Sequence, residues 1–343
     1  MPEALAWSGF ATGNRTAEQL LDAALSQAQK KAAGKPISAA LIAFSPAQLP
    51  APSVALERLA LRLSCVQICA GSFPGILSDA GHCLGQPGCA VLLLSPPVGL
   101  GKRGVAELLW TIPRLLEDGE LPSASADLGS VAVNNSWFWH YRKSVPFLRS
   151  TILGPLQHRQ FYSSGISPLT PLFPHYRQEG ALLLQLERYS ALPLLARHIP
   201  FALREFRRLP LDRILIGEED AKNGRRYLQI VATDVNRSGL WLERPLHPAA
   251  QIFLAWRNPE AARRDTRALL ADADEPAFAW ISSSVGRGDG FFAPAESDWF
   301  LWKEQFPRCP VLGSYGQAEV SHGTGKAHLN RFSTVFDLFY QQS

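Results

Sequence analysis

Two short segments carry side chains whose chemistry suits a charged small molecule. The first is the glycine-rich loop Gly286-Arg287-Gly288-Asp289-Gly290, which follows the apolar run Phe278–Ser282. Glycines let the backbone approach a ligand, exposed amides can face an anion, and strand-end loops often hold ligands. Arg287 can clamp a carboxylate or a phosphate with two parallel hydrogen bonds. One alternative stays open, in which the loop is a simple turn and Arg287 pairs with a neighbouring acid.

The second segment places three polar side chains at alternate positions, Tyr315, Gln317 and Glu319. Alternate residues of an extended segment share one face. A phenol, an amide and a carboxylate together can recognise the ammonium and the carboxylate of an amino acid. The same pattern also fits an ordinary surface strand. The predicted ligand-binding set is Ser284, Gly286, Arg287, Gly288, Tyr315, Gln317 and Glu319.

The cysteines do not predict a metal site or a disulfide framework. They are Cys65, Cys69, Cys83, Cys89 and Cys309. Their number is odd, and no C-x-x-C pair is present, whereas structural zinc sites normally show such close spacing. Cysteine is among the most buried residue types even where it binds nothing. We therefore expect no metal ligands among them.

Two other functional classes remain as alternatives. A haem-based gas sensor would need an axial ligand such as histidine, and the aromatic run Trp137–Tyr141 includes His140. A small-molecule hydrolase would need a nucleophile and a base, for which Ser314, Glu319 and His322 are the candidates. The Gly-x-Ser-x-Gly motif is absent, and sequence neighbours rarely assemble a catalytic triad. No catalytic residue and no cofactor is therefore predicted, and binding rather than catalysis is the expected activity.

Helices alternate with short apolar strands in the first part of the chain. Thr16 caps a helix and Gln19 completes a capping box, while Gly34 and Pro36 end it. A strand over 38–44 and a helix from Ser53 follow. This alternation predicts a partly parallel sheet covered by helices.

The middle of the chain has a different pattern. Turn residues recur every few positions over 131–186, as at Glu179-Gly180, which predicts antiparallel hairpins. Ser190 then caps a helix, and Asn258 and Pro259 begin another one. We predict an α/β fold of two domains with mixed, partly parallel sheets covered by helices.

The predicted domain boundary lies in the charged, proline-bounded interval 204–212, which gives domains of residues 1–203 and 204–343. This interval contains Arg204, Arg207 and Arg208. A basic cluster of this kind is only permissive for nucleic acid, and no nucleic-acid motif accompanies it. Its simplest interpretation is a solvated helix face.

The composition is that of a folded globular protein. Hydrophobic residues make up 46% and charged residues 19%, and the net charge is +4. The first residues do not have the pattern of a signal peptide, and the apolar runs are far shorter than a membrane span. We expect a cytoplasmic protein without membrane insertion and without a nucleic-acid partner.

Two of the segments above resemble the FIST family of sensory proteins. The stretch 280–288, Trp-Ile-Ser-Ser-Ser-Val-Gly-Arg-Gly, is similar to a family strand that ends in Ser-Cys-x-Gly-Arg, with Ser284 in place of the cysteine. The stretch 310–320 is similar to the family's Pro-x-x-Gly-Phe-x-x-x-Gly-Glu-Ile segment. There Ala318 replaces a glycine and Glu319 is retained.

A third similarity lies at the hairpin near Gln178–Gly180. A weaker one lies at the strand end 67–72, where the glycine and the hydroxyl are out of register. The resemblance implies a FIST N-terminal domain followed by a FIST C-terminal domain. It further implies a sensory module that binds an amino acid or a similar metabolite, and some family members are linked to haem and nitric oxide. The chain carries no kinase, receiver or DNA-binding motif, so a protein partner is expected to receive the signal.

Overall fold

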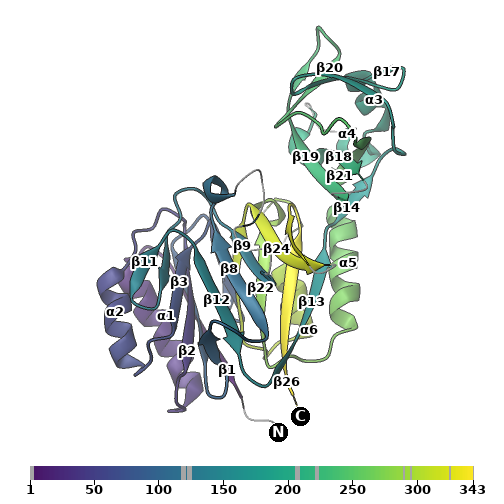
Figure 1. The fold of residues 1–343 in the computed structure, drawn as a ribbon. Coiled ribbons are helices and arrows are strands. Elements are labelled where there is room, and N and C mark those ends of the chain that lie inside the picture. Colours follow the sequence, from purple (N-terminus) through teal and green to yellow (C-terminus); the bar gives the residue numbers. More distant parts are fainter. Residues whose placement is uncertain are drawn as a thin grey trace. The chain divides into compact units, whose positions relative to one another are not determined.

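The chain divides into two compact units. The computed structural model describes residues 4–116, 121, 126–204, 209–220, 224–288, 290–293, 296–323 and 326–342. Unit 1 comprises Met1–Ser164 and Arg263–Ser343, and unit 2 comprises Gly165–Ala262 (Figure 1). Unit 2 is thus inserted into unit 1, and the expected boundary between residues 203 and 204 falls inside it. Arg207 and Arg208 lie outside the described residues.

The first sheet of unit 1 has the strand order β1-β6-β2-β3-β10-β11. Its strands are β1 (Ala6–Thr12), β2 (Ala39–Ser45), β3 (Ile68–Ser72), β6 (Gly88–Leu94), β10 (Phe138–His140) and β11 (Lys143–Val145). Helices α1 (Ala17–Ala32) and α2 (Ser53–Arg62) pack on one face. The predicted capping box of Thr16 and Gln19 is confirmed. Gly9 lets α1 approach closely, because a Cβ atom there would lie 1.9 Å from the Ala24 carbonyl oxygen.

The second sheet of unit 1 has the strand order β13-β26-β22-β23-β4-β5. Its strands are β4 (Gly75–Ser78), β5 (Gly81–Leu84), β13 (Leu156–Ser163), β22 (Phe278–Ser284), β23 (Val311–Gly316) and β26 (Thr334–Gln341). Helices α5 (Pro259–Ala271) and α6 (Asp298–Gln305) contribute Leu270, Leu301 and Trp302 to the core on one face of this sheet. Asn258 caps α5 as expected, since its Oδ1 accepts from the amides of Glu260 and Ala261.

The two sheets repeat one arrangement. The order β1-β6-β2-β3 corresponds to β13-β26-β22-β23, with β2 parallel to β3 and β22 parallel to β23. The remaining pairs in both sets are antiparallel. The helices also correspond, because α1 and α2 precede β2 and β3 as α5 and α6 precede β22 and β23. Only four residues, 13–16, join β1 to α1, whereas unit 2 separates β13 from α5.

A third sheet packs against the other two, with the order β25-β24-β9-β8-β12-β7. Its strands are β7 (Gly99–Gly101), β8 (Ala106–Thr111), β9 (Leu128–Val131), β12 (Leu148–Leu153), β24 (Ala318–Gly323) and β25 (Lys326–Asn330). The short 3-10 helix η1 (Pro113–Leu115) follows β8. Trp110 of this sheet packs against Phe73 and against Trp280 of the second sheet, with ring centroids 5.2 and 5.3 Å apart. The three sheets therefore share one apolar core.

Unit 2 is built on a single antiparallel sheet. Its strands are β14 (Ile166–Pro168), β15 (Tyr176–Glu179), β16 (Leu182–Leu186), β17 (Tyr189–Ser190), β18 (Ile214–Asp220), β19 (Gly224–Asp234), β20 (Gly239–Leu242) and β21 (Gln251–Arg257). Its helices are α3 (Ala191–His198), α4 (Phe201–Arg204) and the 3-10 helix η2 (Leu211–Arg213). Leu194 and Leu195 of α3 pack into a core of their own with the strands. The predicted hairpin at Glu179-Gly180 joins β15 to β16.

The predicted fold class is confirmed, because helices cover mixed sheets that are in part parallel. Strands outweigh helices in the described part of the chain. None of the described helices is long and apolar enough to cross a membrane.

Candidate functional site

The glycine-rich loop begins at the end of β22 and forms a short 3-10 helix, η3 (Val285–Arg287). Ser284 caps it, because its Oγ accepts a hydrogen bond from the Gly286 amide at 3.3 Å. Gly288 packs closely against Leu84, since a Cβ atom there would lie 2.3 Å from a methyl carbon of Leu84. Asp289 lies outside the described residues. These positions therefore shape the loop, and Ser284 and Gly288 are buried in it.

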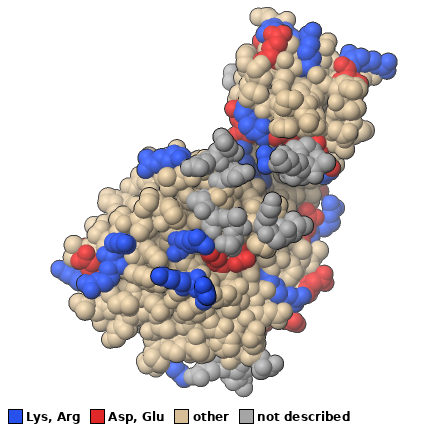
Figure 2. Space-filling model, in the orientation of Figure 1, with Lys and Arg blue, Asp and Glu red and all other residues tan. Residues whose placement is uncertain are grey.

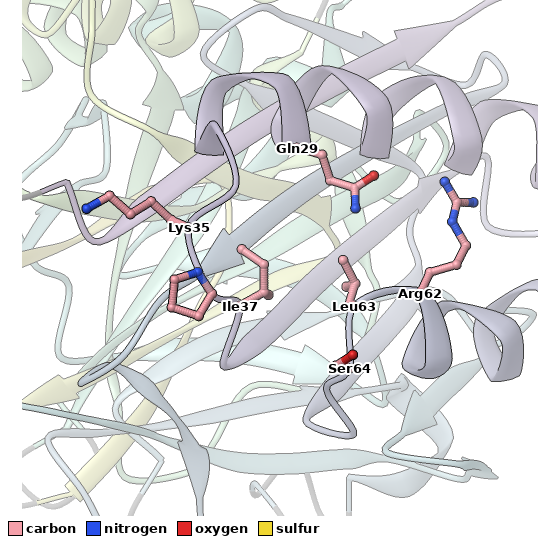
Figure 3. Close-up of a pocket in the computed structure, with 7 residues that line it drawn as sticks. Gln29, Lys35, Ile37, Arg62, Leu63 and Ser64 are labelled. Atoms are coloured by element: carbon pink, nitrogen blue, oxygen red, sulfur yellow. The ribbon is translucent and has the colours of Figure 1, made fainter.

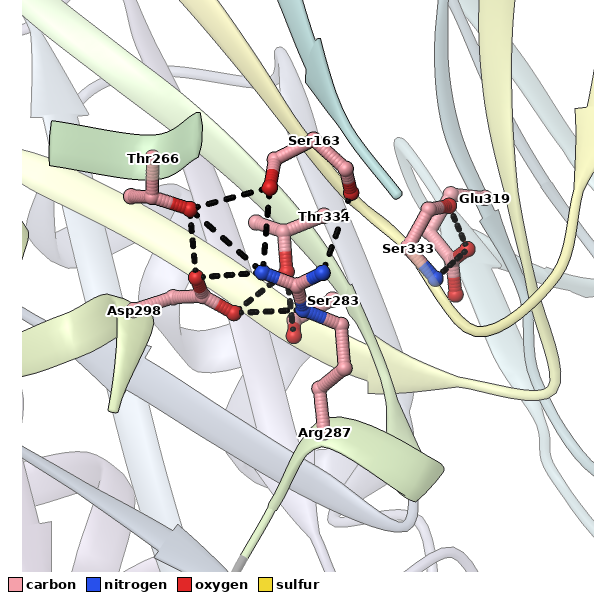
Figure 4. A network of polar contacts seen from close by, with 8 residues as sticks. All are labelled: Ser163, Thr266, Ser283, Arg287, Asp298, Glu319, Ser333 and Thr334. Carbon is pink, nitrogen blue, oxygen red and sulfur yellow. Dashed lines mark hydrogen bonds and ion pairs between the residues drawn. The ribbon is translucent and has the colours of Figure 1, made fainter. Parts of the chain in front are cut away.

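Arg287 is buried and makes an ion pair with Asp298, the first residue of α6 (Figure 4). Its Nε donates to Asp298 Oδ2 at 2.8 Å and its Nη2 donates to Oδ1 at 2.7 Å. The side chain of Arg287 is fully buried and that of Asp298 is 5% exposed. This is the bidentate geometry that the sequence suggested for a ligand, but the partner is a carboxylate of the protein itself.

Neighbouring hydroxyls complete what we call the Arg287 cluster (Figure 4). Arg287 Nη1 donates to the Ser163 carbonyl oxygen at 3.2 Å, and Nη2 lies 3.2 Å from Ser163 Oγ and 3.4 Å from Thr266 Oγ1. Asp298 accepts from Thr266 at 2.9 Å and from Thr334 at 2.7 Å. The cluster thus contains Arg287, Asp298, Ser163, Thr266, Thr334 and Ser283, whose hydroxyl lies 2.9 Å from that of Thr334.

Tyr315, Gln317 and Glu319 do not share one face. Tyr315 is the penultimate residue of β23 in the second sheet and packs in the core under the helices. The chain then crosses to the third sheet, where Glu319 lies in β24, and Gln317 between them is exposed. Gly316 permits the crossing, because a Cβ atom there would lie 2.7 Å from the Val131 carbonyl oxygen. Alternation holds only within one strand, so the predicted common face is wrong.

Glu319 is fully buried, and only one of its two carboxyl oxygens has hydrogen-bond partners among the described residues. Its Oε2 accepts from the Ser333 hydroxyl at 2.5 Å and from the Ser333 amide at 3.4 Å (Figure 4). Its Oε1 has no hydrogen-bond partner among the described residues. Burial raises the pKa of Glu319 from 4.5 to about 8, although the Ser333 hydrogen bonds and the Arg287 charge lower it in part. The carboxyl is therefore mostly protonated at neutral pH.

Buried serine hydroxyls lie near Glu319, between the second and third sheets. Ser130 of β9 lies directly opposite Glu319 of β24 in the antiparallel pair, so the two side chains share one face. The Ser130 hydroxyl lies 2.6 Å from that of Ser314 and 3.1 Å from that of Ser282. We call this set the Glu319 cluster: Glu319, Ser333, Ser130, Ser282 and Ser314.

The backbone beside Ser333 is strained. Phe332 has a φ of 63°, in the left-handed region that an aromatic residue rarely adopts. Its ring is 5% exposed, so packing holds it in this conformation. The turn between β25 and β26 thereby presents both the amide and the hydroxyl of Ser333 to Glu319. Strain of this kind gathers at functional sites, where the surrounding structure maintains it.

The two clusters lie on opposite faces of the second sheet. Ser283 and Thr334, in the Arg287 cluster, are on the face that α5 and α6 cover. Ser282, in the Glu319 cluster, is on the other face because successive strand residues alternate. Arg287 lowers the pKa of Glu319 by its charge, but the two side chains do not converge on one space. The predicted pairing of Arg287 and Glu319 around one ligand therefore has no geometric basis here.

A surface depression of about 350 Å³ lies elsewhere, between the ends of α1 and α2 (Figure 3). Its lining residues are Gln29, Lys35, Pro36, Ile37, Arg62, Leu63 and Ser64. None of the predicted ligand-binding residues belongs to it. On the face that Figure 2 shows, basic and acidic side chains of unit 1 are scattered among uncharged ones.

The residues considered for a hydrolase and for a haem-based sensor contact neighbouring side chains of the protein. The Ser314 hydroxyl contacts Ser130, and His322 pairs with Asp127 at 3.4 Å. His140 stacks on Tyr141 with ring centroids 4.1 Å apart. The described cysteines are buried and free. Within the described ranges, no group of three or more His, Cys, Asp or Glu side chains is placed to hold a metal ion.

Sequence reasoning missed Asp298, Ser333 and Ser130. Asp298 had a visible signal, because an acidic residue in the first turn of a helix is a natural partner for an arginine nearby. Ser333 and Ser130 had none, since their roles depend on strand pairing between distant segments.

No protein-family model matches the chain, and no curated protein matches it. The resemblance to FIST proteins accordingly rests on the quoted segments alone. The first of those segments forms β22 and its loop, and the second forms β23 and β24. Strand β22 pairs with β23, and β24 follows β23 in the chain.

Proposed function

We propose that unit 1 is a sensory unit that binds a small metabolite at the Glu319 cluster. The observation that carries this proposal is Glu319 Oε1, a buried oxygen without a hydrogen-bond partner in the described part of the chain. Leaving a buried polar atom unsatisfied costs about 1–3 kcal/mol. A ligand that supplies the missing hydrogen bond recovers this free energy, so the arrangement favours a bound state.

The position of the cluster supports the proposal. Ser282 and Ser314 face each other in the parallel pair β22 and β23, near the carboxyl ends of both strands. Ligands of α/β proteins commonly bind at that end of a parallel sheet. Phe332, with its strained backbone, lies beside the same group.

The chemistry of the cluster points to a ligand that donates hydrogen bonds, with an amino acid or a similar amine as the best candidate. An ammonium group would donate to Oε1 and would favour the ionised carboxylate. The serine hydroxyls can donate or accept and would serve the remaining polar atoms of the ligand. Arg287 has no direct role in this proposal, because Asp298 already holds it.

The resemblance to FIST proteins points the same way. Glu319 is one of the residues that the chain shares with the family segment, and the family is associated with small-ligand sensing. The proposal includes a protein partner that receives the signal.

A thermal-shift screen against amino acids and related amines tests the proposal. A ligand that binds only the folded protein raises Tm, by an amount that grows with its concentration above Kd. We expect the shift to disappear in Glu319→Gln and to persist in Glu304→Gln, which changes an exposed carboxylate in the same way. Equal shifts in both variants would place the ligand elsewhere, and no shift with any compound would remove the support for sensing.

A further inference from the structure

A second polar group lies on the second sheet, at strand β13, and is separate from the Glu319 cluster. His158 and Gln160 belong to β13, and Gln160 lies directly opposite Asp337 of β26. Asp337 is fully buried, and its Oδ2 has no partner among the residues described. The His158 side chain is 12% exposed, so part of it contacts water.

The backbone fixes the orientation of the Gln160 amide. The His322 amide donates to Gln160 Oε1 at 2.8 Å, so that end of the side chain must be the oxygen. The nitrogen end then donates to the Asp127 carbonyl oxygen at 2.7 Å and to Asp337 Oδ1 at 2.6 Å. Asp337 Oδ1 is therefore a hydrogen-bond acceptor.

This orientation determines the tautomer of His158. Its Nε2 lies 2.9 Å from the same Asp337 Oδ1. When Asp337 is ionised that oxygen can only accept, so Nε2 is the donor in this contact. A neutral imidazole carries one ring hydrogen, so Nδ1 keeps its lone pair. Phe339 stacks on the ring at 5.0 Å between centroids and holds its plane. No partner of Nδ1 occurs in the described part of the chain.

We propose that His158 is a base that takes a proton from water during the hydrolysis of a small ester. The arrangement resembles the acid–histidine pair of hydrolases, in which a buried carboxylate orients the imidazole and stabilises its protonated form. Asp337 has the role of that carboxylate, and Gln160 is a positioning residue that acts through it. The proposal does not depend on ligand binding at Glu319.

The step balances without a cofactor. Nδ1 of His158 takes a proton from water as the water oxygen bonds to the ester carbonyl carbon. The bond from that carbon to the alkoxy oxygen then breaks, and the imidazolium returns the proton to the leaving oxygen. The products are a carboxylic acid and an alcohol.

The charged and titratable groups around the base come from three elements. Asp337 faces it from β26, and Asp127 and His322 lie beyond Gln160, before β9 and on β24. Burial raises the pKa of Asp337, while its contacts with His158 and Gln160 lower it in part.

The first test is nitrogen NMR of histidine-labelled protein, which reads the tautomer without any variant. We expect the hydrogen of His158 on Nε2. A hydrogen on Nδ1 in the neutral ring overturns the proposal, because Nδ1 then has no lone pair for water.

The second test is hydrolysis of p-nitrophenyl acetate, corrected for the spontaneous reaction. We expect His158→Gln to lose the protein-dependent rate, and Asp337→Asn to lower it by about tenfold or more because the tautomer is no longer fixed. His175→Gln removes an exposed histidine of unit 2 and should leave the rate unchanged. A His158→Gln rate equal to that of the unmodified protein overturns the proposal.

Discussion

Glu319 and Arg287 are both buried, but they differ in how completely neighbouring groups satisfy their hydrogen-bonding atoms. Arg287 is satisfied by the Asp298 carboxylate and by several hydroxyls. Glu319 has one serine to bind and leaves an oxygen unsatisfied, so the neutral form is preferred at neutral pH. The type of residue alone does not reveal this difference, because it depends on partners from distant strands.

Glu319 makes the stability of the protein depend on pH. The pKa of this group is raised from 4.5 to about 8, so the folded state binds the proton more tightly than the unfolded state. Its contribution to stability is complete below about pH 4.5 and is lost as pH rises through 8. The full effect is on the order of 4–5 kcal/mol, at 1.36 kcal/mol for each pKa unit.

Glu319→Gln should remove this dependence. Glutamine resembles the neutral carboxyl, so the variant should match the original protein near pH 5 and exceed its stability near pH 8. Urea unfolding at a series of pH values measures both. Parallel stability curves for the two proteins over this range would show that Glu319 does not carry the buried proton.

At the residue scale, the sequence predicted the importance of Arg287 and Glu319 but assigned them one shared ligand. The alternative of an internal acid for Arg287 was also visible, and Asp298 occupies that place. The proximity of Glu319 and Ser130 was not predictable, because residues 130 and 319 meet only through the pairing of β9 with β24.

At the scale of elements, the Arg287 cluster joins six of them, since Ser283 lies in β22 and Arg287 in η3. Arg287 follows β22, Asp298 begins α6, and Thr266 lies in α5. Ser163 ends β13 and Thr334 begins β26. Ser163 and Thr266 are close to the two points where the chain leaves unit 1 for unit 2 and returns. Arg287 therefore contacts unit 1 residues that lie close in sequence to both of these points.

We expect Arg287→Ala to destabilise the protein by about 3–5 kcal/mol, because it leaves the Asp298 carboxylate buried without its counter-charge. Arg287→Lys should recover only part of this loss, since an ammonium cannot make the bidentate contact. Urea unfolding measures both.

Arg267→Ala is the matched control, because it removes an exposed arginine paired with Glu304 and should change stability by less than about 1 kcal/mol. If Arg287→Ala costs no more than this control, the ion pair with Asp298 does not hold the elements together.

Individual elements were predictable from local signals, and their partners were not. The capping box at Thr16 and the hairpin at Gly180 depend on neighbouring residues, and both are present. The sheet to which a strand belongs depends on distant pairing. The change of sheet at Gln317 is an example, since nothing local distinguishes it from a continuous strand.

At the scale of the whole molecule, unit 2 is an insertion whose two ends meet. Ile166 of β14 pairs with Arg257 of β21, and the Asn258 amide donates to the Gly165 carbonyl oxygen at 2.8 Å. The sequence suggested a boundary in the charged interval 204–212, because composition changes there. It could not show that 263–343 returns to complete a sheet with β13.

Unit 2 should therefore be removable. We expect a variant with residues 166–257 replaced by two glycines to fold, because Gly165 and Asn258 are already adjacent and a shorter loop costs less entropy to close. Residues 166–257 alone should also fold, around their own core. Circular dichroism and cooperative thermal unfolding report on both products. Loss of cooperative unfolding in the deletion variant would mean that unit 1 needs unit 2 for its stability.

The repeated strand order has a consequence for synthesis on the ribosome. β26 pairs with both β13 and β22, which do not pair with each other, and it follows them in the chain. Unit 2 is complete before β26 is made, so it can fold while two strands of the second sheet still expose unpaired edges. Such edges are sites of aggregation. The growing chain thus passes through a stage in which unit 2 is folded while the second sheet still lacks β26. Chaperones that bind exposed strands would act at that stage.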